Sequence, residues 1–200
     1  MAHKSHDQAE AVAQLIAWRQ TVSPKRLMEP GPQEQQVSQL FQAAACAPDH
    51  GQINPWRLLI IPKSRRSELG DLFAQALLER DASATLEQVC RAREKAFHAP
   101  FLMLLIVDEG EPAHEIDACE RVLAAGCAVQ SILLLATAMG YGTALTSGKA
   151  LKSNCLRDSL GLRLTERAIC FLNVGTVESK RPFKPRPNEN QFVNVWGNPA

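Results

Sequence analysis

A long apolar segment in the middle of the chain limits most strongly how this sequence can fold. Residues 123–139 are apolar apart from small residues and a few polar ones such as Gln130, and they belong to a helix expected over 115–139. An apolar run of about 17 residues with polar interruptions indicates a buried helix rather than a membrane span. Its many alanines allow close packing, either against its own core or against a second subunit.

Two short, continuous apolar runs indicate strands that are buried on both faces. They cover 58–61 and 101–107, and Pro62 ends the first of them. Two helical segments, 64–79 and 84–98, separate these strands, so a simple alternation of one strand and one helix does not describe the chain. We therefore expect an α+β fold with a central sheet.

The remaining elements complete one domain that spans 1–200. Apolar spacing predicts further helices and strands, and the proline-rich C-terminal tail, from about 177 to 200, is expected to stay extended, where it could wrap a partner. The further helices are expected over 7–21, 33–47 and 149–160, and the further strands over 141–146 and 168–174.

Composition and charge place the chain among ordinary globular proteins. Of its 200 residues, 46% are hydrophobic and 22% are charged, and the formal net charge is +1. Because there is neither a basic excess nor a basic block, no nucleic acid and no acidic membrane is expected as a partner. The polar N-terminus lacks a signal-peptide pattern, so a cytoplasmic location is expected.

The six cysteines are expected to be reduced and mostly buried. They lie far apart in the sequence, with no C-x-x-C pair and no histidine at the spacing of zinc ligands. This pattern argues against disulfides in a chain without an export signal and against structural zinc. We therefore expect no metal.

Two loops and one aromatic residue are candidates for holding a ligand. Arg19 and Thr21 place a guanidinium and a hydroxyl two residues apart, a pair that can bind phosphate, although arginine is also common at the end of a helix. His50 could donate to a ligand or cap its turn, whereas Trp56 is more typical of a core. No nucleophile motif, phosphate-binding glycine loop or carboxylate pair is found, so no catalytic residue is assigned.

Four segments in order resemble the FMN-dependent nitroreductase family, in particular its shortest NAD(P)H-dependent type. The segment from Arg19 to Leu27 is similar to the R-R-S opening of that family, and Ala44 to Arg57 resembles its loop that ends in Asn-Pro-Trp-Arg. The long helix and glycine turn from Ala125 to Gly148 and the closing strand from Phe171 to Thr176 are the third and fourth matches. The likeness runs from about residue 12 to residue 177.

The resemblance implies a nitroreductase-like α/β/α sandwich with a central mixed, mainly antiparallel sheet, in an intertwined homodimer with FMN at the subunit interface. It also implies a ping-pong reaction, in which NAD(P)H delivers hydride to flavin N5 and a nitroaromatic, quinone or similar planar molecule takes the electrons. The flavin carries the redox chemistry, so no dedicated catalytic side chain is required.

Position by position, the resemblance assigns cofactor-binding roles to eight residues. One group would hold FMN within its own chain, and the other would reach the FMN of the other subunit. The first group is Arg19, Gln20, Thr21, Leu145, Thr146 and Ser147, and the second is Cys46 and His50.

Two of these positions depart from the family pattern, because the relatives carry arginines where this chain has Cys46 and Thr146. The lost positive charges could be replaced by Lys149, Lys184 or Arg186. The departures also leave open a non-catalytic flavin- or ligand-binding module of the same fold.

A cysteine-dependent enzyme is a third interpretation, with Cys46 acting together with His50. The two residues are four apart, but Pro48 interrupts the helix that would align them. This interpretation is therefore disfavoured against the two flavin-based ones.

Overall fold

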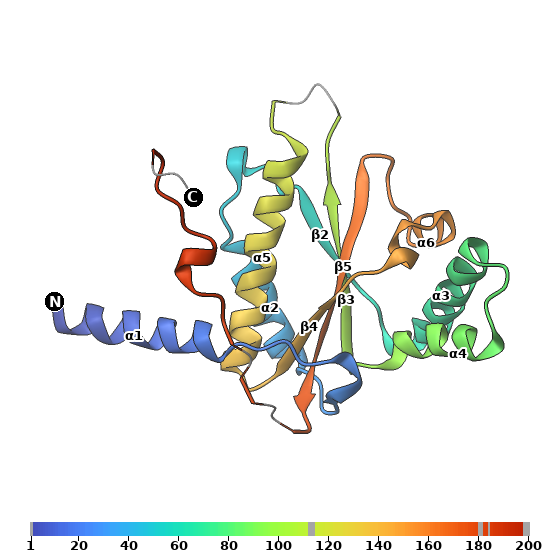
Figure 1. Cartoon of the computed structure of the whole chain (residues 1–200), viewed down its shortest axis with the longest axis horizontal. Helices are drawn as coiled ribbons and strands as arrows, with labels where there is room; N and C mark the ends of the chain where they lie inside the picture. The colour runs from blue at the N-terminus through green and yellow to red at the C-terminus, as the bar shows by residue number, and fades with distance from the viewer. Residues whose placement is uncertain (1, 112–114, 180–181, 184, 198–200) are drawn as a thin grey trace.

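The computed structural model describes residues 2–111, 115–179, 182–183 and 185–197, which form a central sheet with helices on both of its faces (Figure 1). The helices are α1 (Ala2–Trp18), α2 (Glu34–Ala45), α3 (Arg66–Arg80), α4 (Leu86–Glu94), α5 (Ala118–Ala138) and α6 (Asn154–Ser159). The strands are β1 (Leu27–Met28), β2 (Trp56–Ile60), β3 (Phe101–Asp108), β4 (Gly142–Thr146) and β5 (Glu166–Val177).

The strand β5 lies at the centre of the sheet. Its Phe171 is opposite Leu104 of β3 on one edge and opposite Thr146 of β4 on the other. β2 lies outside β3, and β1 pairs with the C-terminal end of β5. These pairs are all antiparallel, and the one parallel contact in the described ranges joins Thr21 to Thr143. The predicted α+β fold with a mainly antiparallel sheet is confirmed.

Both faces of β3 are buried, which explains its unbroken apolar sequence. Every second residue packs against α2 and α5, and the residues between them pack against the layer that contains α3 and α6. The first set is Met103, Leu105 and Val107, and the second is Leu102, Leu104 and Ile106. The sheet is therefore the middle layer of an α/β/α sandwich.

A β-bulge in β5 changes which face its side chains occupy. Leu105 is opposite Cys170, but the next residue, Ile106, is opposite Ala168, so Ile169 is the extra residue. Cys170 consequently packs with the α2–α5 layer and Ala168 with the α3–α6 layer. Without the bulge, two residues separated by an even number would face the same layer.

The apolar helix α5 forms the centre of one layer, as expected. By length and composition alone it is apolar enough to cross a membrane. Its buried residues, however, include Ala125, Ile132 and Ala136, which pack against the sheet and α2. This packing is typical of the core helix of a globular protein.

The structure corrects several predicted element boundaries. The two-residue β1 was not predicted, because two residues are too few to show a strand pattern. The helix expected over 84–98 ends at Glu94 and continues as a 3-10 turn, Lys95–Phe97. The helix expected over 149–160 is divided into a 3-10 turn, Lys149–Lys152, and the short α6.

The prediction that most cysteines are buried is wrong, although all six are free thiols. Only Cys170 is buried, and burial raises the pKa of its thiol to about 11. Cys46, Cys90 and Cys119 are exposed, because they lie at helix ends or on outward helix faces. The described residues contain no group of His, Cys, Asp and Glu side chains that could hold a metal ion.

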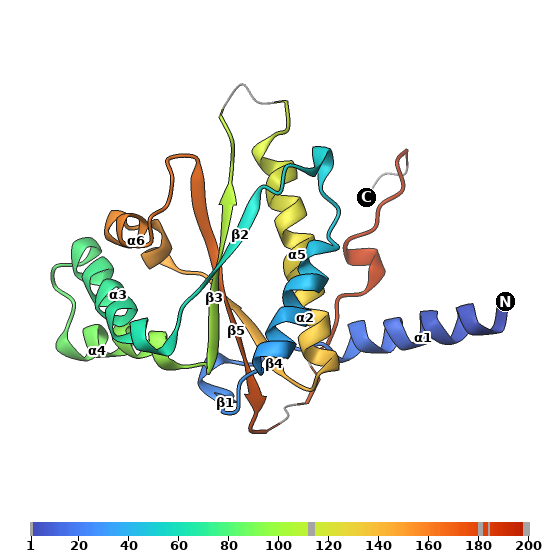
Figure 2. The same cartoon turned by 180° about the vertical axis from the view of Figure 1, so that it is seen from behind.

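The two ends of the chain extend from one side of the body (Figures 1 and 2). α1 projects away from the sheet, with Val12, Ile16 and Trp18 exposed. The C-terminal tail exposes Val195 and Trp196. A projecting helix and a tail that both present apolar side chains to solvent mark a surface suited to another protein chain.

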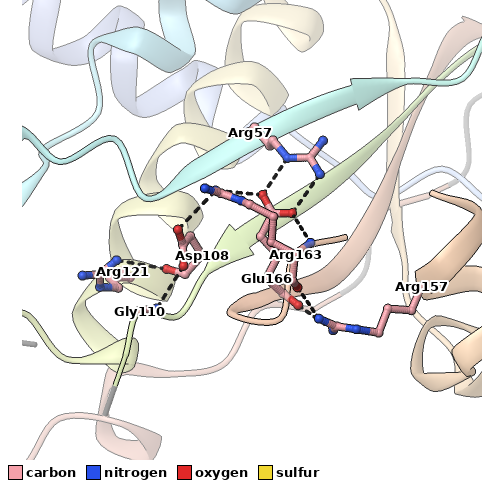
Figure 3. Close-up of polar contacts among 7 residues, drawn as sticks. All are labelled: Arg57, Asp108, Gly110, Arg121, Arg157, Arg163 and Glu166. Atoms are coloured by element: carbon pink, nitrogen blue, oxygen red, sulfur yellow. Dashed lines mark hydrogen bonds and ion pairs between the residues drawn. The ribbon is translucent and has the colours of Figure 1, made fainter. Parts of the chain in front are cut away.

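A buried carboxylate, Glu166, links the start of β5 to β2 (Figure 3). β1 pairs with the other end of β5. Glu166 is 2% exposed and accepts hydrogen bonds from Arg57 Nε and Nη2 at 2.8 and 2.9 Å. The backbone N–H and the guanidinium of Arg163 donate to the same carboxylate at 2.9 and 3.0 Å. The hydrogen bonds from Arg57 are the largest cause that lowers the pKa of Glu166 to about 2.

We expect Glu166→Gln to lower the free energy of unfolding by roughly 3 kcal/mol at neutral pH, because it removes the buried charge to which Arg57 and Arg163 donate. The folded pKa of about 2 lies below the ordinary value of 4.5. The stability contributed by the charge is therefore fully present above about pH 4.5 and is lost as the pH falls toward 2. Urea unfolding at a series of pH values measures both effects.

Glu87→Gln is the matched control, because Glu87 forms an exposed ion pair with Arg91. That change should alter stability by less than about 1 kcal/mol. Equal losses for the two variants, or an unchanged acid limb in Glu166→Gln, would contradict the structural role of the buried carboxylate.

Candidate functional site

The segment that follows α1 lies along the free edge of β4. Thr21 forms a parallel bridge with Thr143, and the backbone N–H of Val22 donates to the carbonyl oxygen of Thr143 at 2.9 Å. The predicted residues Arg19, Gln20 and Thr21 are therefore brought next to the strand that contains Leu145 and Thr146. This part of the predicted site is assembled within one chain.

Gly142 leaves room for neighbouring side chains to pack against the start of β4. A Cβ atom at Gly142 would lie 2.5 Å from Val177 Cγ2 and 2.8 Å from Leu27 Cδ2, both too short for real contacts. The glycine is therefore needed for the side chains of Leu27 and Val177 to pack at the start of β4, whereas Gly140, with φ of 87°, ends α5 in the left-handed conformation. The glycine turn has two separate structural functions.

The edge of β4 beyond Thr21 presents backbone groups that a ligand could use. Successive residues of a strand direct their N–H and C=O groups to opposite edges. Thr143 directs its carbonyl toward Val22, away from β5, so Leu145 is expected to direct its backbone groups to that same side. The side chain of Leu145 is also exposed, at 44%.

Asn173 fixes the hydroxyl group of Thr146. The Asn173 Nδ2 atom donates to Thr146 Oγ1 at 3.0 Å and to the carbonyl oxygen of Ala144 at 3.2 Å. Asn173 is buried, at 3% exposure. Sequence analysis missed this residue, although a single amide within the apolar run of β5 was a signal that it holds a neighbouring strand.

The guanidinium of Arg186 lies at the end of α1, close enough for its charge to affect Arg19. Arg186 Nη2 donates to the backbone carbonyl of Arg19 at 2.7 Å. Partial burial, and secondly the nearby charge of Arg186, lower the pKa of Arg19 below its ordinary value. Among the described residues, neither side chain forms an ion pair with a carboxylate. The pair is therefore suited to an anion, which would reduce the repulsion between the two cations.

A cavity of about 380 Å³ lies beside this pair, between the end of α1, the end of α5 and the tail. Two of the predicted residues, Gln20 and Thr21, contribute to its lining. The ring of Tyr141 lines it too, and its hydroxyl donates to Gln36 Oε1 at 2.8 Å. The first α2 turn is thus fixed to the C-terminal end of α5.

His50 lies at the N-terminal end of α5, and Cys46 directly follows the last residue of α2. His50 Nδ1 is 2.7 Å from Glu120 Oε2, and Glu120 lies in the first turn of α5. This hydrogen bond is the largest cause that lowers the pKa of Glu120. Cys46 is exposed and its thiol donates to the carbonyl oxygen of Gln42 at 3.4 Å. Each residue of the proposed Cys–His pair therefore has a different partner.

The predicted site residues consequently form two groups within one chain. The 21-residue helix α5 spans roughly 30 Å. Its C-terminal end leads into β4 and the Arg19–Thr21 segment, and its N-terminal end holds His50. A single pocket that contains both Thr21 and His50 therefore requires a second copy of the chain.

Of the three residues considered as replacements for the family arginines, the structure describes two, Lys149 and Arg186, and places them apart. Arg186 lies at Arg19, whereas Lys184 is outside the described residues. Lys149 follows Ser147 at the far end of β4, and the four strand steps from Thr143 to Ser147 cover about 13 Å. Arg186 and Lys149 therefore belong to different ends of the site.

We expect Gly142→Ala to lower the free energy of unfolding by about 1–3 kcal/mol, because the methyl group forces Leu27 and Val177 away from β4. Urea unfolding measures the change. Gly126→Ala is the control, since a Cβ there meets no atom within 4 Å and alanine favours the helix. A Gly142→Ala protein as stable as Gly126→Ala would show that Leu27 and Val177 do not pack this closely against β4.

Comparisons with known sequences identify the family of the chain. The model of the nitroreductase family matches residues 16–176. The Escherichia coli K12 protein YdjA, which carries the name NAD(P)H nitroreductase provisionally, is 30% identical over 175 residues, or 87% of this chain and 94% of YdjA. A Haemophilus influenzae protein with the same provisional description is 30% identical over 154 residues, or 77% of this chain and 83% of its own length.

Solved structures share the fold. A nitroreductase-like family protein from Bacillus cereus matches with a TM-score of 0.80 at 19% identity, covering 94% of this chain and 96% of that one. The NADPH:FMN oxidoreductase of Vibrio harveyi, solved in complex with NAD+, matches with a TM-score of 0.73 at 15% identity, covering 94% and 78%. At these identities the likeness concerns the fold.

Proposed function

The chain belongs to the nitroreductase family, and from this premise we propose that it is a homodimeric flavoenzyme that binds FMN and oxidises NAD(P)H. Its second substrate would be a nitroaromatic, a quinone or a similar planar small molecule. The observation that supports this most is the position of Arg19, Arg186 and Thr21. Arg186 is bonded to the backbone of Arg19, and Thr21 bridges to Thr143 at the start of the open edge of β4.

The donor set at this position fits the phosphate of FMN. A phosphate monoester carries roughly −1.5 to −2 charges at neutral pH. Arg19 and Arg186 supply two cations without a competing carboxylate, and Thr21 adds a hydroxyl group. Charge-assisted hydrogen bonds of this kind are among the strongest that a protein offers an anion.

The far end of β4 fits the ring system. The backbone of Leu145 faces the open edge, and Asn173 orients the hydroxyl of Thr146. These groups, with Ser147, would hold the polar edge of the isoalloxazine, and the exposed Leu145 side chain would help exclude water. When bound, FMN supplies the redox chemistry by accepting hydride at N5 and passing the electrons to the acceptor. Two substrates that use one ring face in turn are expected to give ping-pong kinetics.

A second chain would complete the pocket. His50 lies too far along α5 to join Thr21 in the same chain. His50 and Cys46 are both exposed, and in this proposal they would approach the FMN of the partner subunit. The exposed apolar side chains of α1 and of the tail support such a dimer. An exposed apolar surface of this kind is typical of an interface between chains.

Where this chain has Cys46 and Thr146, the family pattern has arginines. In this proposal Arg186 replaces part of the positive charge that is lost. Its guanidinium lies next to Arg19, where the phosphate charge would be. All six cysteines are free thiols, which is consistent with the proposed cytoplasmic location.

We expect Arg186→Ala to raise the Kd for FMN about 10- to 100-fold, because one charge-assisted hydrogen bond to the phosphate is lost. Titration of FMN fluorescence against the FMN-free protein measures the change. Arg65→Ala is the control, since Arg65 forms an exposed ion pair with Glu68, remote from the strand β4 in sequence. Equal affinities in both variants would contradict the phosphate site.

The same preparation tests the activity. The FMN-loaded protein should oxidise NAD(P)H with a nitroaromatic acceptor, and the double-reciprocal plots should be parallel. A colourless protein that fails to bind added FMN would refute the proposal. A yellow protein without turnover would instead favour a non-catalytic flavin-binding module of the same fold.

A further inference from the structure

A second cavity, of about 810 Å³, begins at Ser147 and extends away from the Arg19–Arg186 pair. It lies between the 3-10 turn Lys149–Lys152, the start of α6 and β5. Four cationic side chains line it, and its lining includes no carboxylate among the residues that the structure describes. The four are Lys149, Lys152, Arg157 and Arg167.

The two arginines of this cavity are already held by protein groups. Arg157 Nη1 donates to the backbone carbonyl of Glu166 at 2.8 Å, and Arg157 Nη2 donates to that of Arg163 (Figure 3). Arg167 Nη2 pairs with Glu109 Oε1 at 2.7 Å. These contacts fix the cavity wall; Arg167 is paired with a carboxylate, whereas Arg157, bound to neutral carbonyls, keeps its positive charge beside the two lysines.

The two lysines are positioned together and lack a counter-charge. A 3-10 helix has three residues per turn, so side chains at i and i+3 lie on the same face. Lys149 and Lys152 have this spacing. Neither side chain has an ion-pair or hydrogen-bond partner in the described part of the chain. Two adjacent ammonium groups are suited to a ligand with a high negative charge.

We propose that this cavity binds the 2′-phosphate of the reductant, so that the enzyme uses NADPH in preference to NADH; the inference rests on the proposed function. The nicotinamide has to reach the flavin ring near Leu145 and Ser147, and the cavity adjoins Ser147. The rest of the dinucleotide can then lie in the cavity, whose volume is in the usual range for ligand sites. NADPH carries this 2′-phosphate and NADH does not, so NADPH has roughly 1.5 to 2 more negative charges at neutral pH.

The phosphate of FMN is the competing occupant, and the geometry disfavours it. The Arg19–Arg186 pair lies at the Thr143 end of β4, whereas the lysines follow its other end, about 13 Å farther on. A phosphate bound between Arg19 and Arg186 would therefore lie at the end of β4 that is farther from the lysines. Each cationic site therefore serves a different phosphate, one of the flavin and one of the reductant.

The test replaces both lysines, Lys149→Ala and Lys152→Ala, in one chain. The unmodified FMN-loaded enzyme should have a kcat/KM at least tenfold higher for NADPH than for NADH. The double variant should raise KM for NADPH about 10- to 100-fold, because two charge-assisted contacts are lost, and should raise KM for NADH by less than about threefold. The control is Lys63→Ala with Lys95→Ala, which removes two exposed charges elsewhere.

A binding measurement makes the test independent of turnover. Calorimetry with the FMN-free protein should show adenosine 2′,5′-bisphosphate binding at least tenfold more tightly than 5′-AMP, and the double variant should lose this difference. Equal kcat/KM for the two reductants in the unmodified enzyme, or equal losses for both in the double variant, would overturn the inference.

The outcome for FMN separates this inference from the proposed function. If the double variant instead raises the Kd for FMN, the cavity holds the flavin phosphate and the inference is wrong. If the unmodified protein binds FMN and oxidises both reductants equally, the proposed function stands and only the NADPH preference fails. If it binds no FMN, the proposed function itself fails, and the nucleotide-binding result alone decides whether the cavity recognises the 2′-phosphate.

Discussion

The close contact between the segment after α1 and the edge of β4 determines where every other part of the site lies. It consists of the parallel bridge between Thr21 and Thr143 and the hydrogen bond from the backbone N–H of Val22 to the carbonyl oxygen of Thr143. This contact places Arg19 and Thr21 at one end of an open strand edge, and the tail then adds Arg186. A cationic end followed by a row of backbone groups is the order of chemical groups that a flavin nucleotide requires.

The length of α5 is the reason for proposing that one chain supplies only part of the pocket. The helix separates His50, bound to Glu120 at its first turn, from the Thr21 segment beyond its last turn. The exposed apolar residues of α1 and of the tail lie on a surface that would be costly to leave uncovered by another chain. In this proposal the same second chain would cover the exposed apolar surface and add the missing residues to the pocket.

The sequence predicted the parts of the fold that have a strong local pattern. The continuous apolar run of β3 and the long apolar α5 were both recognised, because burial on all sides leaves a clear signature. β1 could not be predicted from two residues, and the division of 149–160 into a 3-10 turn and α6 depends on packing. The segments of the candidate site came from the family resemblance. The buried Glu166 network and the Asn173 contact needed the structure, because their partners are far apart in sequence.

The FMN content of mixed dimers tests the two-chain pocket most directly. One chain would carry Arg19→Glu and the other Cys46→Trp, so that each homodimer has a defect in both of its pockets. In the mixed dimer, both defects fall in one pocket and the other pocket is built from two unmodified halves. The account predicts one FMN per mixed dimer and none in either homodimer. No FMN in the mixed dimer, or full FMN binding by a single isolated chain, would contradict it.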